Sequence, residues 1–201
     1  IGCEGCWPSW KLPSTNSTPC IEVNRVVVGA ILAGGLSRRM GEDKATLYGG
    51  VTRLQRCFKA AGINTTVVMC GTAARKSLFE GEVWTDPPGA NGLHEVIPWL
   101  LNRVNDDLVL MPCDAYLMSE RALSHYLQRA KRGGVPMDKS GRRQPLFAFI
   151  PKGADLPSTS DSVSHLLDNL PSVDVAPHGE AFTNFNRPSD LQHPQLRRRR
   201  R

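Results

Sequence analysis

The stretch VVVGAILAGGLSRRMGEDK, residues 26–44, decides the fold. It opens with Val26 to Leu32, an unbroken apolar run rich in β-branched residues, which is typical of a strand buried on both faces of a parallel sheet. The run leads directly into a glycine-rich loop, Ala33 to Gly41. Glycine lets the backbone approach a bound group closely and offer it N–H donors. Ligands bind at the carboxyl ends of strands in open parallel sheets, so this junction predicts a binding site.

The alternation of strand and helix continues along the chain. Further strands are expected at Thr65 to Cys70, Glu82 to Thr85, Asp107 to Met111 and Pro145 to Ile150, and helices at Thr52 to Ala61, Ala73 to Phe79, Leu93 to Arg103, Ser119 to Lys131 and Ser160 to Leu170. Ser119 and Ser160 are the expected N-caps of the last two helices. Repeated alternation predicts right-handed βαβ units, and therefore a single Rossmann-like α/β domain whose mainly parallel sheet has helices on both faces.

The two ends of the chain differ from this pattern. Residues 1–24 are rich in Pro, Ser and Thr and show no hydrophobic period, which indicates an extension outside the domain. The domain itself is expected over residues 25–191. Residues 192–201 end in five arginines, and such a run predicts a basic, disordered tail.

The charge balance does not indicate a nucleic-acid-binding protein. Lys and Arg number 25 against 19 Asp and Glu, a net charge of +6, but the terminal arginines supply five of these charges. The longest apolar run, Val26 to Ala33, is far shorter than the roughly 20 residues that cross a bilayer. Ile1 to Trp10 lacks the basic and then apolar pattern of a signal peptide. The cytoplasm is the expected location, with no membrane partner.

Charged residues follow two of the predicted strands. Arg38, Arg39 and Lys44 in and beside the glycine loop favour a polyphosphate ligand. Asp114, in Pro112-Cys113-Asp114, comes directly after a buried strand, where a carboxylate is suited to hold Mg²⁺. The alternative for Asp114 is a capping role in the following turn. Taken together, the loop and the strand-end carboxylate predict nucleotide–Mg²⁺ chemistry.

These segments resemble a known family. Leu32 to Ala45 matches, at every fixed position, the L-A-G-G-x-S-x-R-M-G-x-D-K-A signature of the molybdenum cofactor guanylyltransferases, which belong to the Rossmann-like nucleotidyltransferases. Pro112-Cys113-Asp114 is similar to the P-C-D-x-P of that family, and Gln144-Pro145-Leu146 to its [QH]-P-[TL] segment. Residues 182–191 are similar to its closing F-x-N-x-N-T-P-E-D-L. The motifs occur in the family's order over nearly the whole predicted domain.

The resemblance implies a Mg²⁺-dependent enzyme that joins GMP from GTP to the terminal phosphate of molybdopterin and releases pyrophosphate. It implies that the glycine loop binds the nucleotide through Leu32, Ala33, Gly34 and Gly35. Lys44 would contact the phosphates, Asp86 the nucleotide, and Asp114 both Mg²⁺ and the triphosphate. Asn184 and Asn186 would lie near the pterin phosphate or the metal. Because the transfer brings two anions together, Lys44, Arg39 and Asp114 with its metal are the expected catalytic groups.

Other functions remain open at this point. A cytidylyltransferase acting on the same pterin, or an NMP transfer to another phosphorylated acceptor, would use the same fold, although that cytidine branch tends to read L-A-A-G where this chain has Gly34-Gly35. A weakly active nucleotide-binding docking partner in cofactor delivery is the alternative of another class, since Gly89 to His94 departs from the family's glycine order. The expected partners are GTP and molybdopterin, with proteins of cofactor biosynthesis or molybdoenzyme maturation as further ones.

Three cysteines in the extension have a suggestive spacing. Cys3, Cys6 and Cys20 follow C-x₂-C-x₁₃-C, which resembles the C-terminal iron–sulfur cluster segment of the radical-SAM GTP cyclase of molybdenum cofactor synthesis. Three thiolates suit a cluster with one open iron position. A zinc clip or chance spacing in an unstructured head are the alternatives.

Overall fold

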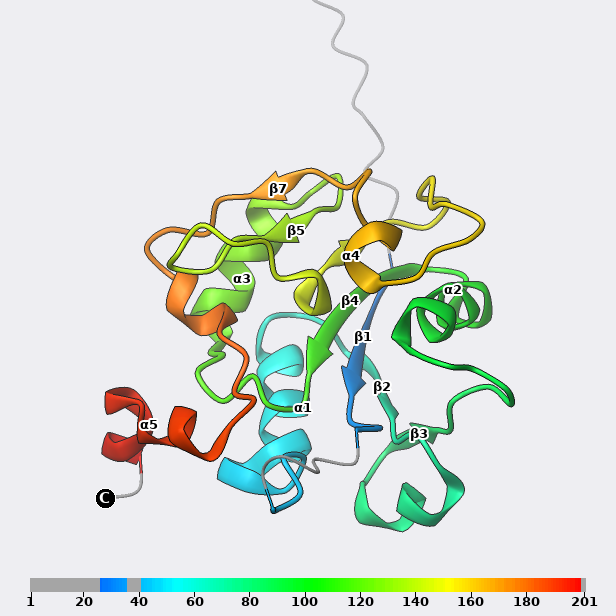
Figure 1. Cartoon of the computed structure of the whole chain (residues 1–201). Coiled ribbons are helices and arrows are strands. Elements are labelled where there is room, and N and C mark those ends of the chain that lie inside the picture. The colour runs from blue at the N-terminus through cyan, green and yellow to red at the C-terminus, as the bar shows by residue number, and fades with distance from the viewer. Residues whose placement is uncertain (1–25, 36–40, 200–201) are drawn as a thin grey trace, which may run out of the picture.

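The computed structural model describes residues 26–35 and 41–199 and contains a central, mainly parallel sheet (Figure 1). Its strands are β1 (Val27–Leu32), β2 (Thr65–Met69), β3 (Glu82–Trp84), β4 (Asp107–Pro112) and β6 (Phe149–Ile150), in the order β3-β2-β1-β4-β6. β3, β2, β1 and β4 run parallel, and β6 pairs antiparallel with β4. The predicted α/β class and mainly parallel sheet are confirmed.

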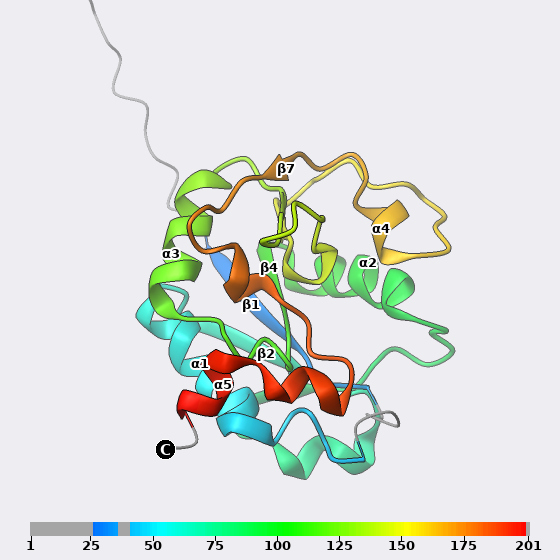
Figure 2. The ribbon, with the colours of Figure 1, turned by 60° about the vertical axis from the view of Figure 1, so that its left-hand side comes forward.

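Helices cover both faces of the sheet (Figures 1 and 2). α1 (Gly50–Ala60) and α3 (Glu120–Arg129) pack on one face, where Phe58 and Tyr126 are fully buried against Ile31. α2 (Leu93–Val104) and α4 (Val163–Leu166) pack on the other, with Ile97 and Leu166 in the core beside Leu110. Burial on both faces explains why β1 is an unbroken apolar run rather than an alternating one.

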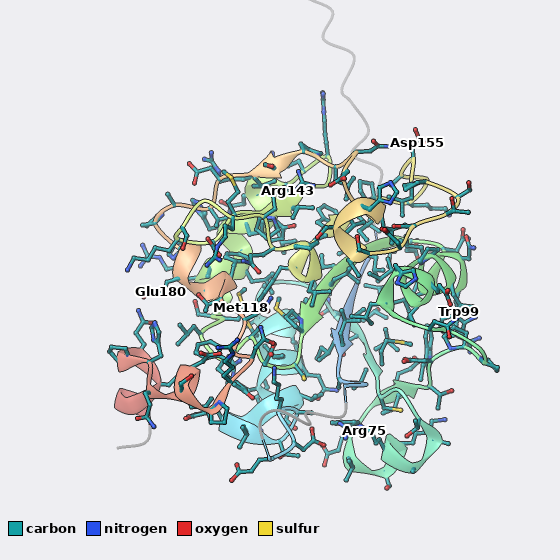
Figure 3. The ribbon with its side chains drawn as sticks, viewed as in Figure 1. Arg75, Trp99, Met118, Arg143, Asp155 and Glu180 are labelled. Atoms are coloured by element: carbon teal, nitrogen blue, oxygen red, sulfur yellow. The ribbon has the colours of Figure 1, made fainter. Side chains whose placement is uncertain are left out.

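A second, two-stranded sheet lies beyond β4 and β6 and was not predicted. It pairs β5 (Val135–Pro136) with β7 (Ser172–Val173) in parallel. Arg143, labelled in Figure 3, ties β7 to the segment after α4, because it donates to Ser172 Oγ (3.0 Å) and to the carbonyls of Leu167 (2.8 Å) and Leu170 (3.1 Å). Two-residue strands are too short for a hydrophobic period to reveal them.

Three expected elements differ in detail. Pro145 to Ile150 is a 3₁₀ turn, η3 (Pro145–Phe147), followed by the short β6, because the Phe147 and Ala148 N–H groups bond back to Gln144 and Pro145 instead of to a neighbouring strand. The helix expected from Ser160 is the four-residue α4, capped by Ser162, whose hydroxyl accepts from the His165 N–H. The segment after β2 is the 3₁₀ helix η2 (Ala73–Leu78). Ser119 is confirmed as the cap of α3, since it accepts from the Ala122 N–H at 3.2 Å.

Part of the segment expected to be a tail forms a helix. After η4 (Gly179–Phe182) and η5 (Pro188–Gln192), the helix α5 (Pro194–Arg199) places Leu196 at 0% exposure in a cluster with Tyr116, Leu117 and Phe185. The five terminal arginines dominate the composition of this segment, so the sequence did not indicate that Leu196 is a buried apolar residue. One more short 3₁₀ element, η1 (Leu47–Gly49), precedes α1. Across the described ranges, no helix has the length and apolarity that crossing a membrane requires.

Candidate functional site

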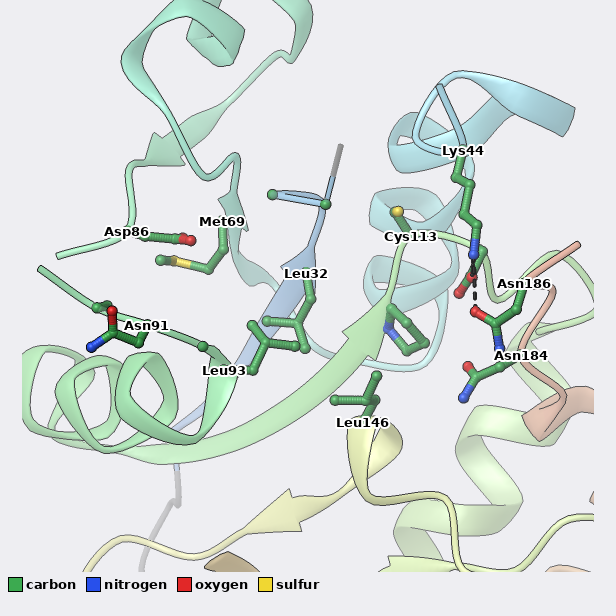
Figure 4. Close-up of a pocket in the computed structure, with 16 residues that line it drawn as sticks. Leu32, Lys44, Met69, Asp86, Asn91, Leu93, Cys113, Leu146, Asn184 and Asn186 are labelled. Carbon is green, nitrogen blue, oxygen red and sulfur yellow. Dashed lines mark hydrogen bonds and ion pairs between the residues drawn. The ribbon is translucent and has the colours of Figure 1, made fainter. Parts of the chain in front are cut away.

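A cavity of about 700 Å³ opens at the carboxyl ends of the parallel strands (Figure 4). β1 delivers Gly34 and Gly35 to it, and β4 delivers Asp114. β1 lies between β2 and β4, so the strand order reverses at this point, which is where open α/β sheets bind ligands. The described lining residues are Leu32, Gly34, Gly35, Lys44, Met69, Asp86, Ala90, Asn91, Gly92, Leu93, Pro112, Cys113, Asp114, Leu146, Asn184 and Asn186.

A largely buried ion pair forms one end of the cavity. Lys44 Nζ lies 2.7 Å from Asp114 Oδ2, and the two side chains are 14% and 9% exposed. Lys44 also donates to Asn186 Oδ1 at 3.1 Å. Burial raises the pKa of Asp114, and the hydrogen bond and charge of Lys44 only partly oppose this rise. This end of the cavity therefore combines a cation with oxygen ligands.

Backbone contacts hold both partners of the pair. The Tyr116 hydroxyl donates to the Lys44 carbonyl at 3.0 Å. Arg53 of α1 donates to the carbonyls of Ala115 (2.6 Å) and Met118 (2.7 Å), in the segment that follows Asp114. Anchored backbone on both sides means that ligand binding need not order this end of the site first.

Arg75 of η2 joins the two ends of the glycine-rich loop. Its guanidinium donates to the Ala33 carbonyl at 2.9 Å and forms a fork with the Asp43 carboxylate at 2.7 and 3.2 Å. Burial alone would raise the pKa of Asp43, but the hydrogen bonds from Arg75 and the Ala45 N–H and the charge of Arg75 hold it below its usual range. The loop that carries Lys44 is thus clamped from a neighbouring element.

Asp86 marks the opposite end of the cavity, with Asn91 beside it, across from Lys44, Asn184 and Asn186 (Figure 4). Burial raises the pKa of Asp86. The loops that follow β1 and β2 pass close together at Gly34 and Gly71. A Cβ at Gly34 would lie 2.9 Å from the Gly71 Cα and 3.4 Å from Asp86 Oδ2, so this close approach requires glycine. Asp86 therefore offers an acceptor for N–H or O–H donors beside backbone that can approach a flat ligand.

Asn184 contributes an oxygen that lacks a partner among the described residues. Its Nδ2 donates to Gln144 Oε1 at 3.1 Å, while its Oδ1 is buried with no hydrogen bond. Mg²⁺ prefers oxygen ligands and is usually held by one or two carboxylates together with substrate phosphates. Asp114 and Asn184 fit that requirement. A cage of three or more His, Cys, Asp or Glu side chains is absent from residues 26–35 and 41–199.

The structure brings most of the predicted site residues to this one cavity: Leu32, Gly34, Gly35, Lys44, Asp86, Asp114, Asn184 and Asn186. Ala33 does not line the cavity: it is 1% exposed, and its N–H donates to the Met69 carbonyl. Arg39 and the cysteines Cys3, Cys6 and Cys20 fall outside the described residues.

Sequence reasoning missed two parts of the site. The loop before α2 and the first residue of that helix line the cavity through residues 90–93. This segment was named from the sequence for its altered glycine order and was assigned no binding role. The Arg75 clamp was also missed, because the only signal was an unexplained arginine in a short helical segment. Its two contacts lie 32 and 42 positions away in the chain.

Comparison with known proteins agrees with this geometry. The family described as the MobA-like NTP transferase domain matches residues 29–166, more than half of the chain. A "Probable molybdenum cofactor guanylyltransferase" of Methanothermobacter thermautotrophicus is 28% identical over 190 residues, which cover 81% of this chain and 96% of the relative. A protein of the same name from Pelotomaculum thermopropionicum is 28% identical over 184 residues, covering 81% and 89%.

Solved structures share the fold. The crystal structure of molybdopterin-guanine dinucleotide biosynthesis protein A from Archaeoglobus fulgidus superposes with a TM-score of 0.59 at 18% identity, covering 86% of this chain and 96% of that one. The family match, over the segment that builds the sheet and most of the cavity, shows that this chain belongs to the MobA-like NTP transferase family and is a nucleotidyltransferase.

Proposed function

We propose that this chain transfers GMP from GTP to the terminal phosphate of molybdopterin, with release of pyrophosphate and with Mg²⁺ as the metal. Its two relatives of 28% identity bear the name of that activity. The observation that carries the proposal is the placement of the buried Lys44–Asp114 pair and of Asp86 at opposite ends of one cavity. One end suits a triphosphate and the other a nucleoside.

The chemistry requires charge neutralisation more than proton transfer. An oxygen of the acceptor phosphate attacks the α-phosphorus of GTP, a new P–O bond forms, and the bond to the bridging oxygen breaks, so that pyrophosphate leaves with the electron pair. The acceptor oxygen is already anionic and needs no general base. Two anions must be held together, and a preorganised cation such as Lys44 lowers that cost most when water is largely excluded, as its 14% exposure indicates.

Asp114 and Asn184 are the residues that would hold Mg²⁺. When bound, Mg²⁺ supplies positive charge to the oxygens of the triphosphate. In the protein alone, Lys44 compensates the Asp114 carboxylate and keeps it in place at 2.7 Å. Tyr116 and Arg53 bond to the backbone around both groups, so this backbone is already held in place before a nucleotide enters.

The nucleoside end favours guanine over cytosine on two grounds. The Asp86 carboxylate is an acceptor suited to the adjacent N1–H and N2–H₂ donors of guanine or to ribose hydroxyls. The Gly34-Gly35 pair agrees with the guanine-specific loop, and an alanine at position 34 would press on the Gly71 backbone at 2.9 Å.

The test is to incubate the protein with Mg²⁺, molybdopterin and either GTP or CTP, and to follow pyrophosphate together with the nucleotide–pterin product. We expect turnover with GTP that requires molybdopterin. A preference for CTP would move the chain to the cytidylyltransferases, and tight GTP binding without turnover would indicate a docking partner.

Two substitutions test the site itself. Lys44→Ala and Asp114→Ala are each expected to reduce kcat/KM about 100- to 1,000-fold, because each removes charge stabilisation in the transition state. Lys59→Ala, which removes an exposed lysine of α1, is the matched control. Turnover of either site variant within threefold of the parent would exclude the assigned role.

A further inference from the structure

Three polar side chains connect a turn of the chain to the cavity. Asp138 Oδ2 accepts from Gln144 Nε2 at 2.7 Å, and Gln144 Oε1 accepts from Asn184 Nδ2 at 3.1 Å. Asn184 lines the cavity on the same side as Lys44 and Asn186 (Figure 4). Gln144 uses its NH₂ group toward Asp138 and its oxygen toward Asn184. Whether Asp138 accepts or donates therefore determines which polar group Asn184 turns toward Gln144.

Asp138 is fixed as an acceptor. Its Oδ1 accepts from the backbone N–H groups of Ser140 (2.7 Å) and Arg142 (3.1 Å), which close the turn. Its side chain is 10% exposed. Burial would raise the pKa of Asp138, but those two N–H groups, Gln144 and the charge of Arg142 together hold it below its usual range. An ionised carboxylate has no donor to offer.

The orientation of both amides follows from this. Gln144 must turn its NH₂ group toward the carboxylate, which leaves its oxygen facing Asn184. Asn184 must then turn its own NH₂ group back toward Gln144. Its oxygen is left on the other side, where it is buried with no hydrogen bond from any described residue. The reverse orientation would present an NH₂ group, a donor suited to a phosphate oxygen.

The backbone keeps the relay together. A Cβ at Gly179 would lie 2.9 Å from the Lys139 nitrogen and 3.1 Å from the Asp138 carbonyl carbon, so η4 can pack on the turn only with glycine there. Asn184 follows two residues after η4. The close approach thus sets the position from which Asn184 reaches Gln144.

We propose that Asp138 and Gln144 are positioning residues which hold Asn184 with its carbonyl oxygen toward the cavity, so that this position binds the divalent cation of a metal–nucleotide complex and not the phosphate of the acceptor. The proposal deepens the function proposed above and rests on it. Asp138 does not line the cavity. It acts on the bound cation only through the amide groups of Gln144 and Asn184.

The test inverts the relay and then restores it. In Asp138→Asn, the two backbone N–H groups keep the side-chain oxygen, so the new NH₂ group faces Gln144. Gln144 and Asn184 then both turn over, and Asn184 presents NH₂ to the cavity. Adding Gln144→Glu places a carboxylate between two NH₂ groups, accepts from both, and returns the Asn184 oxygen to the cavity. The double variant keeps the net charge of the parent.

The readout is Mn²⁺ binding in the presence of GTP, followed by the electron paramagnetic resonance signal of free Mn²⁺, with no acceptor and no turnover. We expect Asp138→Asn to weaken Mn²⁺ binding at least tenfold and the double variant to recover to within threefold of the parent. GTP binding without metal should stay within threefold in all of them. Lys139→Ala, which removes a neighbouring side chain that is 76% exposed, is the control and should match the parent.

Gln144→Met is a second variant that cuts the relay and leaves the 138–142 turn intact. It should weaken Mn²⁺ binding about threefold to tenfold, because Asn184 becomes free to turn. The proposal is overturned by Mn²⁺ affinity within threefold of the parent in Asp138→Asn, by equal weakening in the single and double variants, or by a parent that does not bind Mn²⁺ with GTP. Failure of the molybdopterin assay alone would refute the proposed acceptor and leave this comparison intact.

Discussion

Lys44 and Asp114 compensate each other's charge where both side chains are largely buried. Removing one partner of such a pair leaves the other charge buried and uncompensated. We expect Lys44→Met to lower the free energy of unfolding by about 2–4 kcal/mol, somewhat less than for a fully buried pair. Urea denaturation at neutral pH measures this change.

The double variant Lys44→Met/Asp114→Leu tests whether the lost stability comes from the unpaired charge of Asp114. It should recover at least half of the lost stability, because apolar residues of similar size remove the unpaired charge. Activity should not return. If the single and double variants unfold at the same urea concentration, the pair does not contribute to stability in the way its geometry indicates.

Lys44 is expected to support both stability and activity. Asp86, in contrast, is expected to lower the stability of the fold while it contributes to nucleotide binding. Its pKa in the folded protein is raised by burial, so folding favours the protonated form and the ionised form carries a penalty. The penalty is absent below the unfolded pKa, about 3.9, and fully present above the folded pKa. Asp86→Asn should therefore raise the Tm at pH 7 by about 1–2 °C and have little effect at pH 3.

The same variant should weaken GTP binding, because an amide presents a donor where the nucleoside offers donors. Thermal melting at the two pH values and GTP titration at pH 7 check both parts. A Tm at pH 7 that falls below that of the parent would contradict the account of Asp86 as a stability cost.

At the scale of elements, Arg75 links η2 to the glycine-rich loop through two separate contacts. Arg75→Lys retains the charge but loses the planar fork that reaches the Ala33 carbonyl and both Asp43 oxygens at once. We expect kcat/KM for GTP to fall about tenfold and the amides around Asp43 to exchange hydrogen faster, with global stability within about 1 kcal/mol of the parent.

Lys76→Ala alters the adjacent basic residue of η2, which is exposed, and is the matched control. Unchanged exchange at Asp43 together with an unchanged kcat/KM in Arg75→Lys would show that the loop keeps its shape without the clamp.

The elements that could be predicted from sequence are those whose local pattern agrees with their environment. β1 and β4 are apolar runs because both faces are covered, and α3 has Ser119 as its cap. β6 was expected to be longer, since Pro145 and Leu146 look like strand residues until the turn at Gln144 is known. Ser160 and Ser162 are equivalent caps by type, and only the bond from His165 distinguishes them.

At the scale of the whole molecule, only the site residues that belong to recognisable sequence motifs could be predicted. Lys44 and Asp114 were both expected at the site, and the parallel pairing of β1 with β4 brings their segments to one edge of the sheet. The Asn184 relay could not be predicted, because it joins residues 40 and 6 positions apart through the polarity of their amides. Such a property depends on tertiary contacts that no local pattern encodes.

The helix α5 connects the last described residues of the chain to the Lys44–Asp114 pair. Leu196 of α5 is fully buried in the cluster with Tyr116 and Phe185, and the Tyr116 hydroxyl donates to the Lys44 carbonyl. Leu196→Ala should lower the free energy of unfolding by about 2 kcal/mol, the lower end for a buried leucine because this cluster is small. It should also reduce kcat several-fold, since Tyr116 loses part of its packing and Lys44 becomes less well positioned.

Gln195→Ala is the control, because it removes a neighbouring side chain that bonds to Glu180 and leaves the apolar cluster unchanged. Urea denaturation and pyrophosphate release measure the two effects of Leu196→Ala separately. Loss of stability with an unchanged kcat would mean that α5 only covers an apolar surface. Loss of both would mean that α5, through Leu196, helps to position Lys44 in the cavity.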